Sequence, residues 1–275
     1  MNDPRAALDA IGSLPDTEID IADAALHLAR IDAPEADWQA ARAHLSDLAR
    51  ELVAIAHDIP DRELAARAAG LSTLLAARHG YAGDAETYDD LANANLIRVI
   101  QRRKGLPVAL GILWLHAAHA AGWGAHGVDF PGHFLVALEG HGTQVMVDPF
   151  NVGMPLDAPA LRALLKRVEG PAAEMRPGLL RPMATRRVLL RLQQNIVARR
   201  LRAGALAAAL ACTEDMLRIA PEAAESWRQA AFMNQRLDRV TEALRCFQRF
   251  LALVPEGDAA IRVQDVIQEL RARRG

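Results

Sequence analysis

The spacing of apolar residues changes twice along this chain, and the changes divide it into three stretches. Residues 1–80 and 185–275 place apolar side chains three and four positions apart, which predicts helices. Residues 81–165 instead combine turn-rich sequence, one long apolar run and short β-branched runs, which predicts a helix packed with strands. The pattern therefore predicts an α+β fold, with a helical N-terminal segment, followed by an all-α tail.

Clustered glycines and prolines place the predicted domain boundaries. Five such residues fall between Gly170 and Pro182, in a stretch without apolar periodicity. Clustering of this kind is typical of a linker. We expect a first domain over residues 1–168, a linker over 169–184 and a second domain over 185–275.

Three helix starts are predicted within the first stretch. Residues 17–20 have the character of a capping box opened by Thr17. Residues 34–35 suit the first turn of a long amphipathic helix that includes Trp38. Asp61 is predicted to cap a third helix. These helices are expected to pack against the domain that follows.

A long apolar helix and three strands are predicted in the middle stretch. Pro107 suits the first turn of the helix and Gly122 its end. The helix is shorter than the roughly 20 apolar residues that a bilayer crossing requires, so it is predicted to be a buried core helix. The strands are expected at residues 125–130, 133–138 and 144–148, with the last two forming a hairpin.

A histidine and an aspartate stand at the two ends of the predicted hairpin. If Gly140 and His141 form a two-residue type II′ turn, His133 lies directly opposite Asp148. The Cβ atoms of such a pair are roughly 4.5–5.5 Å apart. A three-residue loop would instead shift the register by one and place Asp148 on the other face. A His–Asp pair of this kind is two thirds of a nucleophile-activating triad.

The tail contains an internal repeat. Pro221 and Pro255 are 34 residues apart. The second unit matches the tetratricopeptide pattern, in which aromatic and small residues let paired helices interlock. The matching residues are Trp227, Ala231, Ala243, Phe247 and Pro255. The unit ending at Pro221 is a weaker match, with Thr213 in the aromatic position, and residues 258–274 are predicted to form a terminal capping helix.

Composition argues against several classes of partner. The net charge is −2 and 24% of residues are charged, so overall charge does not favour nucleic acid or an anionic membrane. The compact basic run at residues 102–104 is interpreted as a solvated turn rather than a phosphate site. No signal peptide is predicted. The only cysteines, Cys212 and Cys246, lack metal-ligand spacing, and we expect a cytoplasmic protein.

Three motifs resemble one protein family. They are the run from Asn95 to Leu110, the Pro-Gly-His segment ending at His133 and the Asp-Pro-Phe segment beginning at Asp148. In this order they resemble the bacterial branch of the transglutaminase-like superfamily that carries a tetratricopeptide tail, often labelled an invasion-gene regulator of the Sir-B type. The resemblance covers roughly residues 15–270. It implies a papain-like core, with a central helix packed on an antiparallel sheet, and places His133 and Asp148 at the catalytic His and Asp positions.

The resemblance also implies that the nucleophile is missing. Active members of the superfamily carry a cysteine at the start of the central helix. Counting back from Gly122 by the length of that helix gives Pro107, or Ala109 if the helix is offset by two, and no Cys, Ser or Thr occurs between Thr87 and Thr143. If Pro107 is the equivalent residue, the backbone N–H that papain-like sites use in the oxyanion hole is absent too. Losing one such donor costs on the order of 10²–10³ in rate.

Residues around the His–Asp pair are expected to line the former cleft. They are Asn95, Pro107, Ala109, Gly132 and Phe134. Asn95 could alternatively cap a helix, which is the better-supported interpretation.

No metal or cofactor is predicted. Zinc accepts imidazole and carboxylate ligands, and His126, His133, His141 and Asp148 offer both. Their spacing matches no standard site, and His141 falls at a loop tip.

Two functions of different class follow. The first is a non-catalytic binding or regulatory protein, with a protein or peptide partner recognised by the cleft and the helical tail and with no nucleic-acid or membrane partner. The alternative is a hydrolase in which His133, oriented by Asp148, acts as a general base on water. Such assistance is typically worth about 10²–10⁴ in rate. The missing nucleophile favours the binding protein.

Overall fold

A computed structural model of the chain describes residues 3–60 and 63–272. Its contacts divide the chain into two units, a larger one of residues 15–192 and a smaller one of residues 1–14 with 193–275. The division falls within one helix, α8 (Thr185–Arg202). The domain limits expected from the sequence remain predictions; the contact division differs from them by grouping residues 1–14 with the C-terminal unit.

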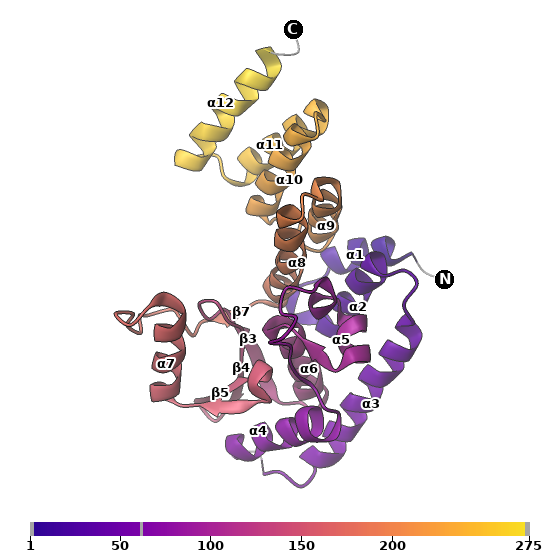
Figure 1. Ribbon diagram of the computed structural model, residues 1–275, viewed down its shortest axis with the longest axis vertical. Coiled ribbons are helices and arrows are strands. Elements are labelled where there is room, and N and C mark those ends of the chain that lie inside the picture. The colour runs from indigo at the N-terminus through magenta and orange to yellow at the C-terminus, as the bar shows by residue number, and fades with distance from the viewer. Residues whose placement is uncertain (1–2, 61–62, 273–275) are drawn as a thin grey trace. The chain divides into compact units, whose positions relative to one another are not determined.

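Helices make up the first half of the larger unit (Figure 1). They are η1 (Asp16–Glu18), α2 (Ile21–Asp32), α3 (Trp38–Ala56), α4 (Leu64–Ser72), η2 (Thr73–Arg78), η3 (Leu91–Ala94), α5 (Leu96–Arg102) and α6 (Pro107–Ala120). Helix α6 is apolar all round and almost entirely buried, as a helix without a polar face must be. The predicted core helix is confirmed. No described helix combines the length and the apolar character that crossing a bilayer demands.

Aspartates rather than the predicted residues begin two of these helices. Asp20 caps α2, where its carboxylate accepts hydrogen bonds from the backbone N–H groups of the first turn at 2.9 and 3.1 Å. The capping box predicted at Thr17 is wrong, because residues 16–18 form a separate 3₁₀ turn. Helix α3 starts at Trp38, capped by Asp37, and not at residues 34–35. In both cases a carboxylate adjacent to the apolar stripe satisfies the free N–H groups better than the earlier residues could. Asp61 lies outside the described residues.

A five-stranded antiparallel sheet forms the other half of the larger unit, with strand order β6–β5–β4–β3–β7. Its strands are β3 (Gly124–Val128), β4 (Leu135–Gly140), β5 (Thr143–Asp148), β6 (Met154–Leu156) and β7 (Pro182–Met183). Strand β7 comes from the segment predicted as linker. Two further short strands, β1 (Ala82–Gly83) and β2 (Lys104–Gly105), pair in parallel elsewhere in the unit.

The sheet lies between α6 and α7 (Ala158–Glu169). Leu135 and Ala137 of β4 pack with leucines of α7. Because side chains alternate along a strand, Val136 and Leu138 belong to the opposite face, where α6 packs against β3 and β4. The predicted α+β core, with a central helix on an antiparallel sheet, is therefore confirmed.

The hairpin register differs by two residues from the prediction. Its turn has His141 and Gly142 as central residues, both with positive φ (51° and 77°), which is a type I′ turn rather than a type II′ turn at 140–141. Gly140 pairs with Thr143, and His133 precedes β4 instead of facing Asp148 within the ladder. Gly142 makes this possible, since a I′ turn needs two left-handed residues. A shift of two keeps every side chain on its expected face.

The smaller unit is entirely helical within the described residues. Besides the end of α8 it contains α1 (Pro4–Gly12), α9 (Leu206–Ile219), α10 (Ala224–Arg236), α11 (Val240–Leu253) and α12 (Asp258–Ala272). Ala231 of α10 and Ala243 and Phe247 of α11 are fully buried, as the tetratricopeptide pattern requires, so the predicted helical repeat is confirmed. Helix α1 packs on α9, where Arg5 makes a bidentate ion pair with buried Asp215. Arg274, the predicted end of the capping helix, lies outside the described residues.

Candidate functional site

A tight turn presents His133 just before β4. The His133 N–H donates to the carbonyl of Phe130 at 2.9 Å, which closes a four-residue turn around Pro131 and Gly132. Gly132 has a φ of 62°. Proline followed by a left-handed glycine is the pattern of a type II turn, so this part of the site is encoded locally. A Cβ at Gly132 would also lie 2.5 Å from a methyl carbon of Val168.

Asp148 closes β5 and caps the short helix η4 (Pro149–Asn151). Its Oδ1 accepts hydrogen bonds from the backbone N–H of Phe150 at 3.0 Å and of Asn151 at 3.3 Å. Its Oδ2 accepts a third from the Asn151 side chain at 2.6 Å. Because the carboxylate is held from both oxygens, its orientation is set before any ligand arrives.

His133 and Asp148 meet directly. The imidazole Nε2 lies 2.8 Å from Asp148 Oδ1, and the two side chains are 12% and 3% exposed. Burial alone would raise the pKa of Asp148, but the hydrogen bond and charge of His133 and the hydrogen bonds from Asn151 outweigh it, so the pKa lies below its usual value. An ionised carboxylate can only accept, so Nε2 is the donor and Nδ1 of the neutral ring keeps the lone pair.

Two aromatic rings, those of Phe150 and Tyr88, follow His133 in a series of edge-on contacts. Phe150 stands edge-on to the His133 imidazole, with ring centroids 6.0 Å apart, and Tyr88 stands edge-on to Phe150 at the same spacing. Tyr88 is 41% exposed, whereas His133 is mostly buried. Phe150 therefore links the mostly buried histidine to an accessible aromatic side chain from a different part of the sequence.

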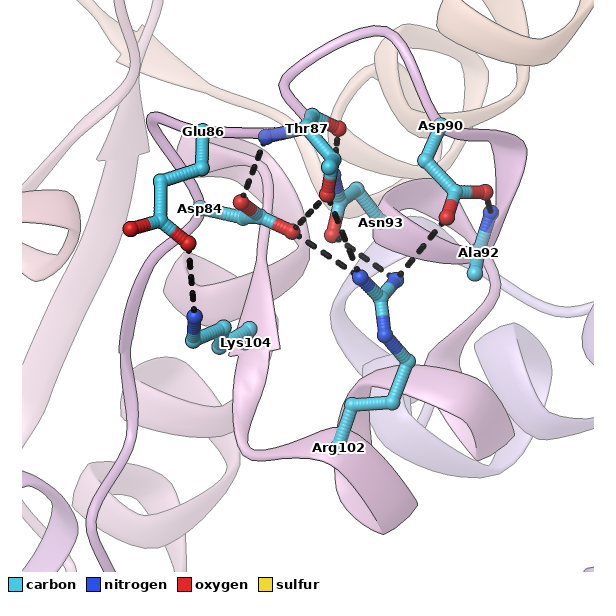
Figure 2. Close-up of polar contacts among 8 residues, drawn as sticks. All are labelled: Asp84, Glu86, Thr87, Asp90, Ala92, Asn93, Arg102 and Lys104. Carbon is cyan, nitrogen blue, oxygen red and sulfur yellow. Dashed lines mark hydrogen bonds and ion pairs between the residues drawn. The ribbon is translucent and has the colours of Figure 1, made fainter.

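The loop that carries Tyr88 is braced by a polar network (Figure 2). Buried Asp84 accepts from the N–H and hydroxyl of Thr87, at 2.9 and 2.6 Å, and from Arg102 at 2.9 Å. Asn93 donates to the Thr87 carbonyl at 2.7 Å and accepts from Arg102. The Thr87 hydrogen bonds are the main reason that the pKa of Asp84 falls to about 2. Since Tyr88 directly follows Thr87, the network fixes the backbone from which Tyr88 extends.

This network was missed from the sequence. The basic run at residues 102–104 predicts a solvated turn, but Arg102 pairs with a buried aspartate and the Lys104 Nζ lies 3.5 Å from a carboxylate oxygen of Glu86 (Figure 2). The only available signal was an acidic segment followed by a basic one, and sequence spacing alone does not show that the two meet.

The residues expected around the pair are mostly buried. Asn95 caps α5, with its Oδ1 accepting from Arg98 N–H and its Nδ2 donating to the carbonyl of Ala29, so the capping alternative describes its contacts. Pro107 and Ala109 occupy the buried first turn of α6.

Phe134 has no exposed surface. A Cβ added at Gly111 or at Gly127 would lie 2.3 or 2.6 Å from its ring, so the ring is packed against α6 and β3. Phe134 therefore supports the site from inside the core.

The zinc-type set is not brought together. His126 pairs with Glu139 at 3.0 Å, and His141 is at the exposed hairpin tip, so only His133 and Asp148 meet. Within residues 3–60 and 63–272, no three His, Cys, Asp or Glu side chains form a group that could hold a metal ion.

Comparison with known proteins agrees with this architecture. Residues 39–194 match the family model of the transglutaminase-like superfamily, and residues 196–268 match a tetratricopeptide-repeat model. The chain is 31% identical over 244 residues to a UPF0162 protein of Vibrio cholerae, covering 88% of this chain and 89% of the relative. It is 32% identical over 190 residues to a UPF0162 protein of Xylella fastidiosa strain Temecula1, covering 68% of each chain. A UPF0162 protein of Pseudomonas aeruginosa is 28% identical over 98% of this chain and 96% of its own length.

Proposed function

Because the chain belongs to the transglutaminase-like superfamily and carries tetratricopeptide repeats, we propose that it is a non-catalytic protein-binding module. The papain-like core recognises a peptide, acyl or amide-like group beside His133, and the repeats dock a protein partner. Stacked helical repeats commonly provide binding surfaces, which supports the second part. Cys212 and Cys246 are buried and are not joined in a disulfide, which supports a reducing, cytoplasmic setting.

One observation carries the proposal: His133 and Asp148 meet, while the first turn of α6 contains no Cys, Ser or Thr. The start of α6, where the resemblance implies that the superfamily nucleophile would stand, holds Pro107 and Ala109, neither of which can attack a carbonyl. Residues 88–142 contain no Cys, Ser or Thr, and the hydroxyl of Thr87 is engaged by Asp84. When no nucleophile is present, the imidazole that Asp148 orients is suited to accept a hydrogen bond from a bound group through Nδ1 of His133.

A second candidate is a hydrolase in which His133 activates water. It is favoured by the tautomer that Asp148 imposes, because Nδ1 of His133 is then the basic nitrogen. General-base assistance of about 10²–10⁴ could hydrolyse a reactive ester or thioester. Peptide bonds would need an oxyanion hole as well, and Pro107 offers no N–H for one.

Two measurements on the same three proteins separate the candidates. Wild type, His133→Ala and His141→Ala are compared, because His141 is an exposed histidine of the same hairpin and serves as the matched control. The first measurement is affinity capture from native lysate with quantitative mass spectrometry. We expect wild type and His141→Ala to capture a protein for which the affinity of His133→Ala is about tenfold lower, which corresponds to about 1.4 kcal/mol. Circular dichroism melting confirms that all three fold.

The second measurement is hydrolysis of p-nitrophenyl acetate. The binding proposal predicts no turnover that depends on His133. Hydrolysis that His133→Ala abolishes and His141→Ala retains would favour the hydrolase. An acyl adduct seen in the intact mass would refute the non-catalytic proposal outright.

A further inference from the structure

Arg191 of α8 contacts both ends of the turn that carries His133. Its Nη2 donates to the carbonyl of His133, the last residue of the turn, at 2.6 Å, and its guanidinium also forms an ion pair with Asp129, which directly precedes the turn. The guanidinium carbon lies 6.0 Å from the ring centroid of Phe134. One side chain thus contacts the Asp129 carboxylate, the His133 carbonyl and the Phe134 ring, although it lies 58 residues beyond His133 in the sequence.

The start of α8 is anchored so that Arg191 reaches this turn. Strand β7 pairs with β3 immediately before the helix, with Pro182 opposite Val128. The carboxylate of Asp16 then accepts hydrogen bonds from the N–H groups of Thr185 and Arg186, at 2.7 and 2.9 Å. The strand pairing before α8 and the Asp16 hydrogen bonds together fix the position of the N-terminus of the helix. They therefore also fix the position of Arg191 along the helix.

We propose that Arg191 is a positioning residue for His133, holding the turn so that the imidazole stays against Asp148. The inference rests on the proposed function only in treating His133 as the functional side chain. A type II turn defines its own internal geometry but not its placement relative to β5, where Asp148 lies. The charged, planar guanidinium supplies that placement, because it can donate to a carboxylate and a carbonyl at the same time.

Lysine cannot reproduce this contact. Its ammonium is a single charged point at the end of a flexible chain, so it can satisfy the Asp129 carboxylate or the His133 carbonyl but does not present a rigid pair of donors to both. The inference therefore predicts that Arg191→Lys impairs the site although it conserves the charge.

The test reads the His133–Asp148 hydrogen bond directly. In the full-length protein with ¹⁵N-labelled histidine, the Nε2–H of His133 is identified as the ring resonance that disappears in His133→Ala. Its exchange with water is then measured in Arg191→Met and Arg191→Lys. Arg187→Met is the matched control, because Arg187 is an exposed arginine one turn earlier on the same helix.

We expect wild type and Arg187→Met to exchange alike, and Arg191→Met and Arg191→Lys to exchange at least about tenfold faster. Unchanged exchange in a folded Arg191→Met protein would overturn the inference. If that variant does not fold, Asp129→Asn decides the question, since Asp129 is 44% exposed and its loss releases one end of the turn. Exchange as slow as in wild type would then overturn it. No partner is needed for this readout, so the result is independent of whether the proposed binding function holds.

Discussion

Replacing Gly153 by alanine tests how tightly the segment beyond Asp148 is packed on the central helix. Gly153 follows η4, has a φ of 78°, and donates its N–H to the Asp148 carbonyl at 2.8 Å. A Cβ at this position would lie 1.9 Å from Cη2 and 2.4 Å from Cζ2 of Trp114. Trp114 is 1% exposed, so it has no open space into which to move. The substitution combines backbone strain with overpacking.

The two costs can be separated by a matched substitution. A left-handed conformation costs a residue with a Cβ roughly 1–2 kcal/mol, and overpacking a filled core costs about 1–3 kcal/mol more. Gly142 has a φ of 77° but nothing within 4 Å of an added Cβ. Gly142→Ala should therefore carry the strain alone, while Gly153→Ala should lower the free energy of unfolding by about 2–5 kcal/mol in total.

Urea denaturation followed by tryptophan fluorescence measures both variants. With a slope of about 1–3 kcal/mol per molar urea, the overpacking cost corresponds to a midpoint for Gly153→Ala on the order of 1 M below that of Gly142→Ala. Equal midpoints for the two variants would refute the reasoning, because they would mean that the Trp114 side chain moves aside without lowering the free energy of unfolding.

Three further substitutions have defined outcomes. Asp148→Asn keeps one acceptor oxygen but loses the charge that His133 and η4 contact. Urea midpoints should therefore report a free energy of unfolding lower by about 1.5–3 kcal/mol. A variant as stable as wild type would contradict the described hydrogen bonds. The pKa of Asp84 is lowered to about 2 in the folded protein, whereas an aspartate in the unfolded chain has an ordinary pKa of about 4. Ionised Asp84 therefore contributes its full stabilisation of the folded state above about pH 4, and this contribution is lost as the pH falls toward 2. Wild type should therefore exceed Asp84→Asn in stability at pH 6 and lose most of that advantage by pH 2. A constant difference would exclude the carboxylate as its source. Asp20→Ala removes the cap of α2 and should cost about 1 kcal/mol by thermal melting, whereas no change would show that water replaces the cap.

The helical parts of the molecule were predictable because their signals are local. Pro107 at the first turn and Gly122 after the last define α6 within a few residues of each end, and Gly122 adopts the positive φ expected of a helix stop. The buried Ala231 and Phe247 likewise repeat a pattern that a single pair of helices satisfies. Helix starts were less predictable, since Asp20 and Thr17 compete for the same role over three positions.

The sequence by itself determined the order of turns, strands and helices near His133, because proline, glycine and alternating apolar residues act on their own neighbours. It did not determine their ends, since β3 stops at Val128 and β4 starts at Leu135, two residues from the limits expected. It did not determine the hairpin register, since Gly140 and Gly142 each permit a two-residue turn and the choice depends on how the whole strand pair packs. Only the tertiary structure decided that Asp84 meets Arg102 and that Arg191 reaches the turn of His133. Those contacts join segments 18 and 58 residues apart, and packing, rather than local spacing, brings such side chains together.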